Sequence, residues 1–343
     1  MSASSLPFPT RPQRSRELVL KHFWRCDDKR CPDESFHFSI VIPNGWGALD
    51  TPVTPPTVGG PLVSLGVYRN ATLVTAEVEV HACMLTREVA PAQWLDIYLD
   101  RLGVELLERR EVRTEGGTVA DVLTRSPTSD EPLVTRWLAM KNYNRLFLIE
   151  GRALAPNYPS EAEAIFLAVT SVSLLNPVDW PLAERLLSYS RHLPGDFLLL
   201  YPESWTLTED PGNDERALQI KLVQRVENVA VGTLAFVTVA RDAESDPHKL
   251  LARFIDDVRR AGATLEVPPL LPGEPRRDFE RTWHATAVAA LGPVPMEVRA
   301  WIGERPDAWF FLGLYGPARA ADDECWAVNT RAFEVVLRYL KVE

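Results

Sequence analysis

One short pattern occurs twice in this chain, and it predicts two copies of one domain. Ile42-Pro43-Asn44-Gly45-Trp46 in the first half corresponds to Tyr201-Pro202-Glu203-Ser204-Trp205 in the second, 159 positions later. A set of helix positions also recurs, at +3, +4, +7 and +11 from a proline. This spacing is one face of an amphipathic helix with proline in its first turn. The two sets are Pro91, Trp94, Leu95, Tyr98 and Leu102, and Pro247, Leu250, Leu251, Phe254 and Val258.

The composition is that of a globular protein with substantial cores. The 343 residues are 46% hydrophobic and 24% charged, which suits two domains of ordinary size. The formal net charge of -10 argues against a nucleic-acid partner, because such a partner requires a basic face. An acidic chain of this kind is compatible with a cationic or an apolar protein partner.

Neither a membrane span nor a secretion signal is expected. No stretch reaches the roughly 18 apolar residues that crossing a bilayer requires. Near the N-terminus, Leu18-Val19-Leu20 is interrupted by Lys21 and His22 before an apolar signal core forms. The four cysteines are too few and too unevenly spaced for a disulfide framework. We therefore expect a cytoplasmic protein without stable membrane insertion.

The repeat and the order of the predicted elements divide the chain into four parts. Residues 1–35 are an N-terminal extension, expected to be partly disordered because its start is polar and contains several prolines. Residues 36–175 form a first domain, 176–195 a linker with a short helix at 182–189, and 196–343 a second domain. Each domain shows strands, a helix, further strands and a final helix. This order predicts α+β domains, each with an antiparallel sheet and helices on one face.

Two helix starts carry capping signals. Ser160-Glu161-Ala162-Glu163 is a capping-box sequence, which predicts that a helix opens at Ser160. Asp246 precedes Pro247 and is expected to cap the helix of the second domain. Both helices belong to the repeated strand–helix order.

The repeated unit resembles the PsbP-like, or Mog-type, family, which includes bacterial DcrB-like domains. One matching feature is a Pro-x-x-Trp sequence at the end of an early strand, at Pro43 and Trp46 and again at Pro202 and Trp205. The other is the order of the elements that follow. The resemblance covers both predicted domains and implies two tandem α/β/α sandwiches with antiparallel sheets.

Members of that family are mainly binding proteins, so the resemblance implies a non-enzymatic role. They include photosystem subunits, a Ran-binding factor, lipoproteins, and cytoplasmic chaperones for membrane-penetrating effectors of type VI secretion. The chaperones are most similar to this chain, being acidic and bacterial and using paired domains to hold apolar effector helices in grooves. This chain departs from them by carrying both copies in one polypeptide and by its N-terminal extension.

No group of residues in the sequence has the pattern of a catalytic or metal site. Cys26 and Cys31, with a histidine on either side, make half of a zinc site at most, whereas structural zinc takes four ligands, usually in closely spaced pairs. His81 and Cys83 share one face of a strand, but no third group is placed to orient them, so a packed strand pair is the simpler interpretation. We therefore expect no intrinsic catalysis, no bound metal and no cofactor.

Trp137, Tyr143, Trp301 and Trp309 are the candidate partner-binding residues. All four lie on or beside the two long meanders of predicted strands. On an exposed sheet face they would form a row of apolar anchors for a helix or peptide. The alternative is that they fill the two cores, as large aromatic side chains usually do.

The sequence favours a binding protein, with two alternatives for how it acts. In the first, it is an adaptor or chaperone that holds an apolar or amphipathic segment of a protein partner, with a secretion-system effector as one candidate. In the second, it is an immunity-type or regulatory protein that docks on one folded partner and blocks it. A large exposed apolar groove would favour the first, and a flat surface with charge complementarity the second. A closed pocket with convergent titratable groups would instead indicate an enzyme.

Overall fold

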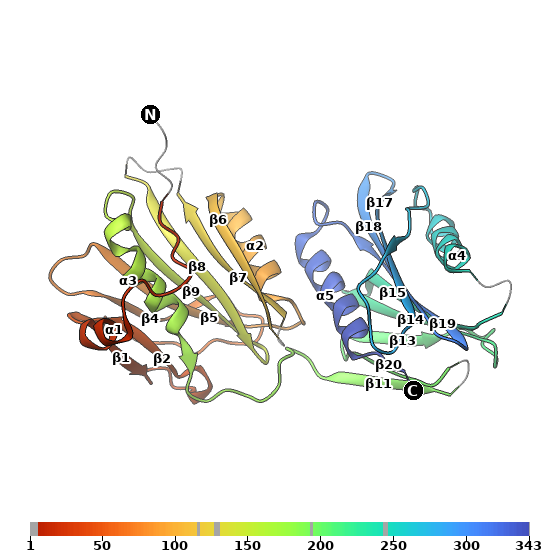
Figure 1. Ribbon diagram of the computed structural model, residues 1–343, viewed down its shortest axis with the longest axis horizontal. Helices are drawn as coiled ribbons and strands as arrows, with labels where there is room; N and C mark the ends of the chain where they lie inside the picture. The colour runs from red at the N-terminus through yellow and green to blue at the C-terminus, as the bar shows by residue number, and fades with distance from the viewer. Residues whose placement is uncertain (1–5, 115–116, 127–130, 193–194, 243–245, 343) are drawn as a thin grey trace. The chain divides into compact units, whose positions relative to one another are not determined.

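The chain folds into two units that share one topology (Figure 1). The computed structural model describes residues 6–114, 117–126, 131–192, 195–242 and 246–342. The two compact units are Met1–Ala183 and Glu184–Glu343. Each has five strands, a helix, four strands, a helix and a short final strand in the same chain order, and the first unit adds two short helices. The predicted α+β fold with a repeated unit is confirmed.

The first unit is built on a seven-stranded antiparallel sheet of order β3-β4-β5-β9-β8-β7-β6. Its strands are β3 (Trp46–Ala48), β4 (Val63–Asn70), β5 (Ala76–Met84), β6 (Glu105–Thr114), β7 (Gly117–Arg125), β8 (Leu133–Asn142) and β9 (Arg145–Leu154). A smaller sheet contains β1 (Phe23–Asp28), β2 (Phe38–Pro43) and β10 (Ser173–Leu174). The helices are α1 (Arg16–His22), the 3-10 helix η1 (Glu34–Phe36), α2 (Pro91–Leu102) and α3 (Tyr158–Ser171).

The second unit repeats this plan with the sheet order β13-β14-β15-β19-β18-β17-β16. Its strands are β13 (Trp205–Glu209), β14 (Ala217–Val226), β15 (Val229–Ala240), β16 (Leu271–Pro272), β17 (Arg281–Leu291), β18 (Val294–Glu304) and β19 (Ala308–Pro317). The smaller sheet contains β11 (Leu186–Arg191), β12 (Phe197–Pro202) and β20 (Lys341–Val342). The helices are α4 (Pro247–Arg260) and α5 (Asp323–Tyr339).

Helices cover both faces of each large sheet, so each unit is an α/β/α sandwich. Successive residues of a strand point to opposite faces. In β9, Phe147 packs in the core under α3, whereas Leu148 packs in the core under α2. In β19, Phe310 faces α5 and Phe311 faces α4. The expectation of helices on one face was wrong, because the central strands are apolar on both sides and both sides need a cover.

The repeated helix template forms α2 and α4, and its apolar side packs on the sheets. Leu95, Leu251, Phe254 and Val258 are buried. Leu102, the last template position of α2, is 47% exposed, contrary to the pattern. The cause is local, since α2 ends there and the next residue is a glycine in the left-handed conformation, a usual way to end a helix.

The segment at 182–189 does not form the predicted helix. Residues Leu186–Arg191 are β11, which pairs antiparallel with β12 along its whole length. This strand corresponds to β1 of the first unit, which pairs with β2. Residues 16–28 of the predicted extension are therefore ordered as α1 and β1, and residues 1–5 lie outside the described part of the chain.

The helix starts were predicted with mixed success. The side chain of Asp246 accepts a hydrogen bond from the main-chain N–H of His248 and caps α4, as expected. The capping box at 160–163 was wrong, because α3 begins at Tyr158, and the hydroxyl of Ser160 donates to the carbonyl of Asn157 at 2.8 Å. Within the described residues, no helix combines the length and apolar character that a membrane span requires.

Replacing Phe254 with alanine should strongly destabilise the second unit. Its ring lies 5.2 Å from the ring of Phe311 and packs over Gly313, where an added Cβ would come within 2.6 Å of it. The loss of a large buried aromatic side chain typically costs about 3–5 kcal/mol. Chemical denaturation should show this loss for Phe254→Ala, while Lys221→Ala, at an exposed position of the same unit, should change stability by less than about 0.5 kcal/mol. Equal effects would mean that the buried face of α4 is misassigned.

Candidate functional site

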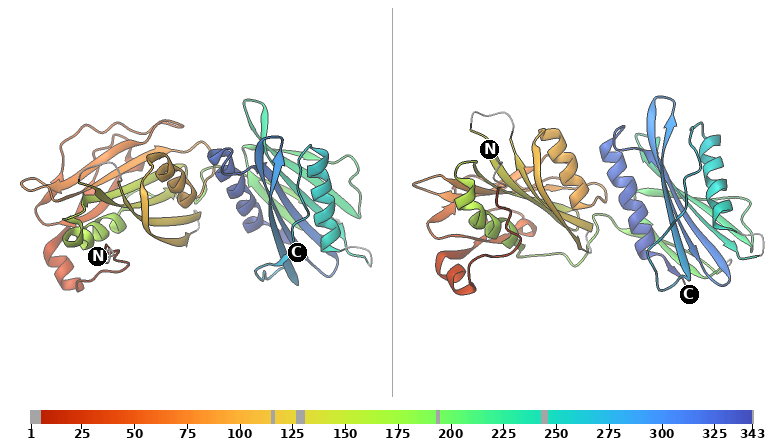
Figure 2. Two further views of the ribbon diagram at one scale, coloured as in Figure 1. Left: turned by 90° about the horizontal axis from the view of Figure 1, so that it is seen from above. Right: turned by 45° about the horizontal axis from the view of Figure 1, so that its top comes forward.

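An irregular segment near the start of the chain lies along the first unit beside α3 (Figures 1 and 2). We call residues 6–14 the N-terminal strap. The strap contains no helix or strand, in keeping with its three prolines. Leu6 and Phe8 pack against the main core of the unit, and Pro9 is buried. This part of the predicted extension is therefore packed on the domain.

Arg136 of β8 is the centre of the strap's binding site. Its side chain is fully buried. Its Nε and Nη2 donate to the two carboxylate oxygens of Asp121 at 2.9 and 2.6 Å, and Nη2 also donates to the carbonyl oxygen of Pro9 at 2.8 Å. The guanidinium carbon lies 4.5 Å from the ring centroid of Phe8 and 4.7 Å from that of Phe166. Because a buried charge without partners is strongly destabilising, the strap helps to make this arginine tolerable in the interior.

Two further side chains hold the main chain of the strap. Arg110 of β6 donates from Nη1 to the carbonyl oxygen of Thr10 at 2.9 Å. The Oε1 atom of Glu163, on α3, accepts from the main-chain N–H groups of Gln13 and Arg14 at 3.0 and 2.7 Å. The other oxygen of Glu163 pairs with the guanidinium of Arg14 at 3.1 Å. The capping-box sequence predicts a capping role for Glu163, whereas in the structure Glu163 accepts hydrogen bonds from the main chain of the strap.

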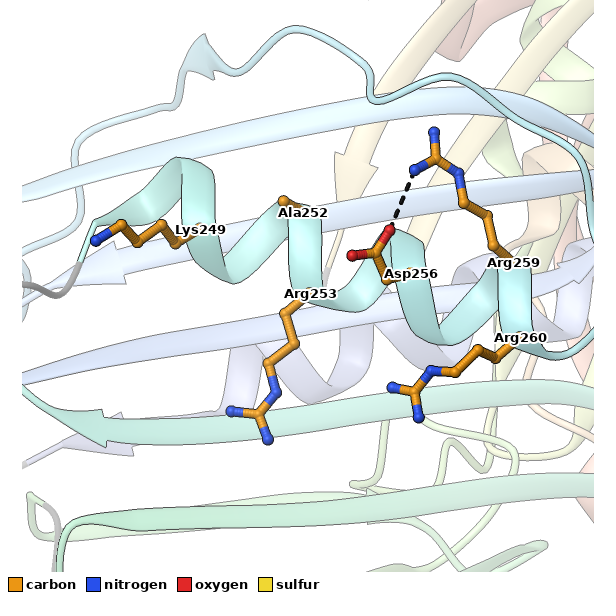
Figure 3. A pocket seen from close by; sticks show the side chains of 6 residues that line it. All are labelled: Lys249, Ala252, Arg253, Asp256, Arg259 and Arg260. Carbon is orange, nitrogen blue, oxygen red and sulfur yellow. Dashed lines mark hydrogen bonds and ion pairs between the residues drawn. The ribbon is translucent and has the colours of Figure 1, made fainter.

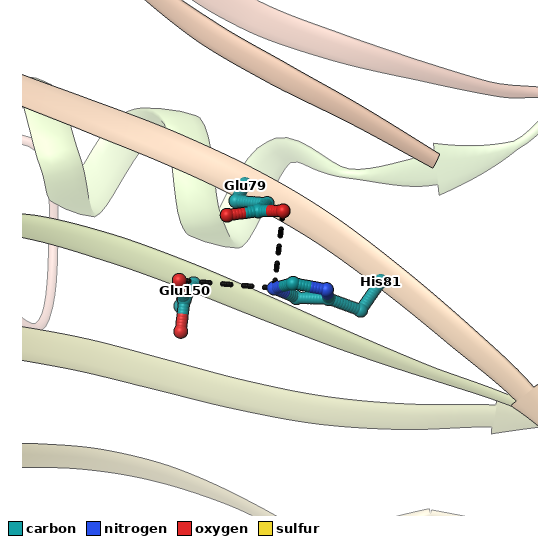
Figure 4. A group of neighbouring side chains, drawn as sticks. All are labelled: Glu79, His81 and Glu150. Atoms are coloured by element: carbon teal, nitrogen blue, oxygen red, sulfur yellow. Dashed lines mark ion pairs between the residues drawn. The ribbon is translucent and has the colours of Figure 1, made fainter. Parts of the chain in front are cut away.

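A cluster of ionisable side chains lies on the opposite face of the same sheet (Figure 4). Glu77, Glu79 and His81 alternate along β5, and Glu150 and Arg152 lie across from them on β9. The Nε2 atom of His81 is 3.7 Å from carboxylate oxygens of both Glu79 and Glu150. Among the described residues, these three form the one group of His, Cys, Asp or Glu side chains close enough to share a metal ion.

Arg152 already supplies a shared cation to the carboxylates of this cluster. It contacts Glu150 at 2.7 Å through Nη1, and Glu77 at 2.5 Å and Glu79 at 3.5 Å through Nη2. Burial lowers the pKa of Arg152, but Glu150 and Glu77 outweigh burial and hold it above its ordinary value. A metal ion would have to displace this guanidinium. The geometry therefore favours an ionic network that stabilises the sheet face over a metal site.

In the part of the second unit that the structure describes, the ionic cluster has no counterpart. Glu79 pairs with Glu150 in the first sheet, whereas Ala235 pairs with Gly313 at the corresponding place in the second. A crevice of only about 20 Å³ lies there beneath α4, too small for a ligand. The alternation of charges along β5 is visible in the sequence, but the contribution of β9 depends on pairing between strands that are far apart in the sequence.

The residues around Cys26 and Cys31 form a buried polar network. Asp28 is buried and accepts from Arg30 at 2.6 Å and from the hydroxyl of Tyr68. Burial raises the pKa of both thiols. Burial likewise raises the pKa of Cys83, on β5, to about 11. None of these cysteines has the lowered pKa of a reactive thiol.

The four aromatic residues expected to bind a partner lie mostly in the cores. Trp137, Trp301 and Trp309 are 5%, 7% and 4% exposed. Trp137 donates to the hydroxyl of Thr124 at 2.8 Å, and the other two tryptophans pack in the second unit. Tyr143 is half-buried at the β8–β9 turn, with a positive φ of 56°. The three tryptophans thus lack the exposure that a row of anchors requires, and partner binding by these residues stays a prediction.

The outer face of α4 is strongly charged (Figure 3). Lys249, Arg253, Arg259 and Arg260 line it. Arg259 pairs with Asp256 at 3.1 Å, and Arg260 pairs with a neighbouring aspartate. The opposite side of the helix is buried, so this charged side is the solvated half of an amphipathic helix. It is nonetheless a basic surface on an acidic chain.

Comparison with known proteins finds similar solved structures. No family model and no curated protein matches the chain. Cyanobacterial PsbP (CyanoP) from Synechocystis sp. PCC 6803 is 11% identical with a TM-score of 0.34, covering 45% of this chain and 92% of that chain. The Ran-binding protein Mog1p of Saccharomyces cerevisiae is 10% identical with a TM-score of 0.31, covering 46% and 96%. The immunity protein TplEi of T6SS from Pseudomonas aeruginosa is 12% identical with a TM-score of 0.24, covering 93% and 97%. Structures of the PsbP and Mog type are thus among those similar to this chain, as the sequence resemblance predicted.

Removing the guanidinium of Arg152 should destabilise the first unit. The Arg152→Ala variant leaves three carboxylates close together on one sheet face without their shared cation. Because Arg152 is about one-third exposed, we expect a modest loss, about 1–3 kcal/mol at pH 7. Urea denaturation of this variant and of Arg225→Ala, at an exposed position in the second unit, would separate the effect from general charge removal. Equal stabilities of the two variants would contradict the role assigned to Arg152.

Asp28 should contribute stability that depends on pH. Burial raises its pKa, but hydrogen bonds from Arg30 and Tyr68 outweigh burial and hold the pKa below its ordinary value. A carboxyl with a depressed folded pKa stabilises the protein above its unfolded pKa, about 3.9, and loses that contribution as the pH falls through the folded value. Asp28→Asn should therefore cost about 2–4 kcal/mol at pH 7 and progressively less below about pH 4. A cost that is constant from pH 7 to pH 3 would contradict this assignment.

Proposed function

We propose that this protein is a non-enzymatic adaptor or chaperone that holds a linear, mainly apolar segment of a protein partner. A secretion-system effector is the candidate partner that the family resemblance suggests. The proposal rests on one observation, the manner in which the first unit holds the N-terminal strap. Arg136 and Arg110 bind carbonyl oxygens of the strap, and Glu163 binds its N–H groups.

These contacts are typical of peptide recognition. A site that reads main-chain atoms binds segments of varied sequence, and neighbouring pockets for apolar side chains add affinity. Here Phe8 occupies such a pocket beside Arg136. The unit therefore has both parts of a peptide site, a set of main-chain ligands and an aromatic pocket.

The site should bind the strap sequence when it is supplied separately. A chain lacking residues 1–14 should bind a labelled peptide with the sequence of residues 1–16, measured by fluorescence polarisation. Glu163→Gln should weaken binding about tenfold, because two hydrogen bonds to a charged acceptor and an ion pair are weakened. Glu161→Gln is the matched control, since Glu161 lies on the same helix and bonds to Thr75 rather than to the strap. The full-length chain should bind the peptide more weakly, because its own tethered strap competes.

Two outcomes would contradict the proposal. One is a folded, truncated chain that does not bind the peptide. The other is binding that Glu163→Gln and Glu161→Gln affect equally. In either case the strap would be ordinary domain packing, and the function would lose its support.

The outer face of α4 favours the alternative function, an immunity-type or regulatory protein that docks on a folded partner and blocks it. Four basic side chains line this face of a chain with a net charge of -10. An acidic folded partner would be steered to such a face. If docking there is the main contact, Arg253→Glu should slow association and reduce its dependence on salt, whereas Glu163→Gln should leave it unchanged.

A further inference from the structure

The arginine that binds the strap has a counterpart in the second unit. Strands β9 and β19 both have ten residues and the same place in their sheets. Arg136 pairs with Gly151, the seventh residue of β9, and Arg299 of β18 pairs with Leu314, the seventh residue of β19. Arg299 therefore occupies the same position in the second sheet as Arg136 in the first, under the final helix of its unit.

The neighbour of Arg136 on β7 is buried, whereas the neighbour of Arg299 on β17 is exposed to solvent. In the first unit the side chain of Arg136 is fully buried, and its cross-strand neighbour Leu123 is buried with it. In the second unit the cross-strand neighbour of Arg299 is Thr286, which is exposed. Val288, the next residue of β17 on this face, is 72% exposed. In the second unit, Phe279 covers this face beside Trp301, with the two rings 5.0 Å apart, but Thr286 and Val288 stay exposed.

Arg299 has hydrogen-bonding capacity left for a ligand. Its Nε donates to Glu297, which also accepts from the indole N–H of Trp326, on α5, at 2.7 Å. Nη1 and Nη2 have no hydrogen-bond partner among the described residues, and the side chain is 26% exposed. The indole of Trp326 is half-buried beside this pair. We call Thr286, Val288, Arg299 and Trp326 the second-unit face.

The charged side chains on the second-unit face differ from those around the strap. In the first unit, Asp121 and Glu163 surround a strap that carries Arg11 and Arg14. The second-unit position that corresponds to Asp121 is His284, which is exposed. A second cation, Arg319, lies 5.6 Å from the ring of Trp326. Two arginines lie on this face, Arg299 beside Glu297 and Arg319 beside Trp326, and they suit a ligand with acidic side chains.

We propose that the second-unit face binds a linear segment of the partner protein that is apolar and acidic, with a main-chain carbonyl accepted by Arg299 and an apolar side chain on Val288. This inference rests on the proposed function. It extends that function to a second, open site that differs from the first in charge preference. The two units then hold two different stretches of one partner.

The test uses the full-length chain, in which the strap occupies the first site. The probe is a labelled peptide with the sequence of residues 5–15 and the changes Arg11→Glu and Arg14→Glu. We expect saturable binding in fluorescence polarisation, with the unchanged strap sequence binding about tenfold more weakly. Val288→Glu and Arg299→Gln should each weaken binding about tenfold. Val226→Glu, at a 46% exposed valine of β14, is the matched control and should have no effect.

Three results would overturn the inference. They are the absence of saturable binding, binding that Val288→Glu and Arg299→Gln leave unchanged, and binding lost in Glu163→Gln instead. In the last case the peptide has exchanged with the strap, which supports the first site while removing the second. Because Val288 is exposed, Val288→Glu tests the face without disturbing the core.

Discussion

A helix can cover only part of a seven-stranded sheet, and this limit shapes both units. Neighbouring strands lie about 4.8 Å apart, so the seven strands of each sheet span roughly 30 Å, whereas a helix with its side chains is about 10 Å wide. Each face therefore keeps strands that its helix does not reach. In the first unit the strap lies on such strands on one face, and the ionic cluster lies on the other. In the second unit the corresponding strands on one face, β17 and β18, carry Thr286, Val288 and Arg299 of the second-unit face.

The two units share their apolar framework and differ in the strips that the helices leave uncovered. Two carboxylates directly opposite each other on neighbouring strands repel, so the Glu79–Glu150 pair depends on Arg152 lying between them. The second sheet has Ala235 and Gly313 at that place and needs no counter-charge. The arginines under α3 and α5 show the same contrast. Arg136 is neutralised by Asp121 and enclosed by the strap, whereas Arg299 keeps two nitrogens for other contacts.

Local patterns predicted the parts of the fold that depend on local physics. The +3, +4, +7 and +11 spacing identified α2 and α4, because helix periodicity places those residues on one side. The strand at 186–191 was missed, because its identity comes from pairing with β12 rather than from its own alternation. The sequence left open whether the tryptophans on the meanders lie on an exposed sheet face or fill the cores, because a strand sequence does not show which side a second helix will cover. The strap contacts could not be predicted from local patterns, because they join residues about 100–150 positions apart.

The tether of the strap has a consequence for how a partner would bind under the proposed function. Because the strap is covalently attached, it competes for the first site at an effective concentration of roughly millimolar. This effective concentration does not depend on the concentration of the protein. A free segment must therefore bind the first site much more tightly than the strap, or be brought close to it by another contact. The second-unit face has no such competitor among the described residues, so it can make that first contact. Its acidic preference would also keep the basic strap from occupying it. Under this proposal, binding therefore occurs in a fixed order. The partner first binds the open site of the second unit, and it then displaces the tethered strap from the first.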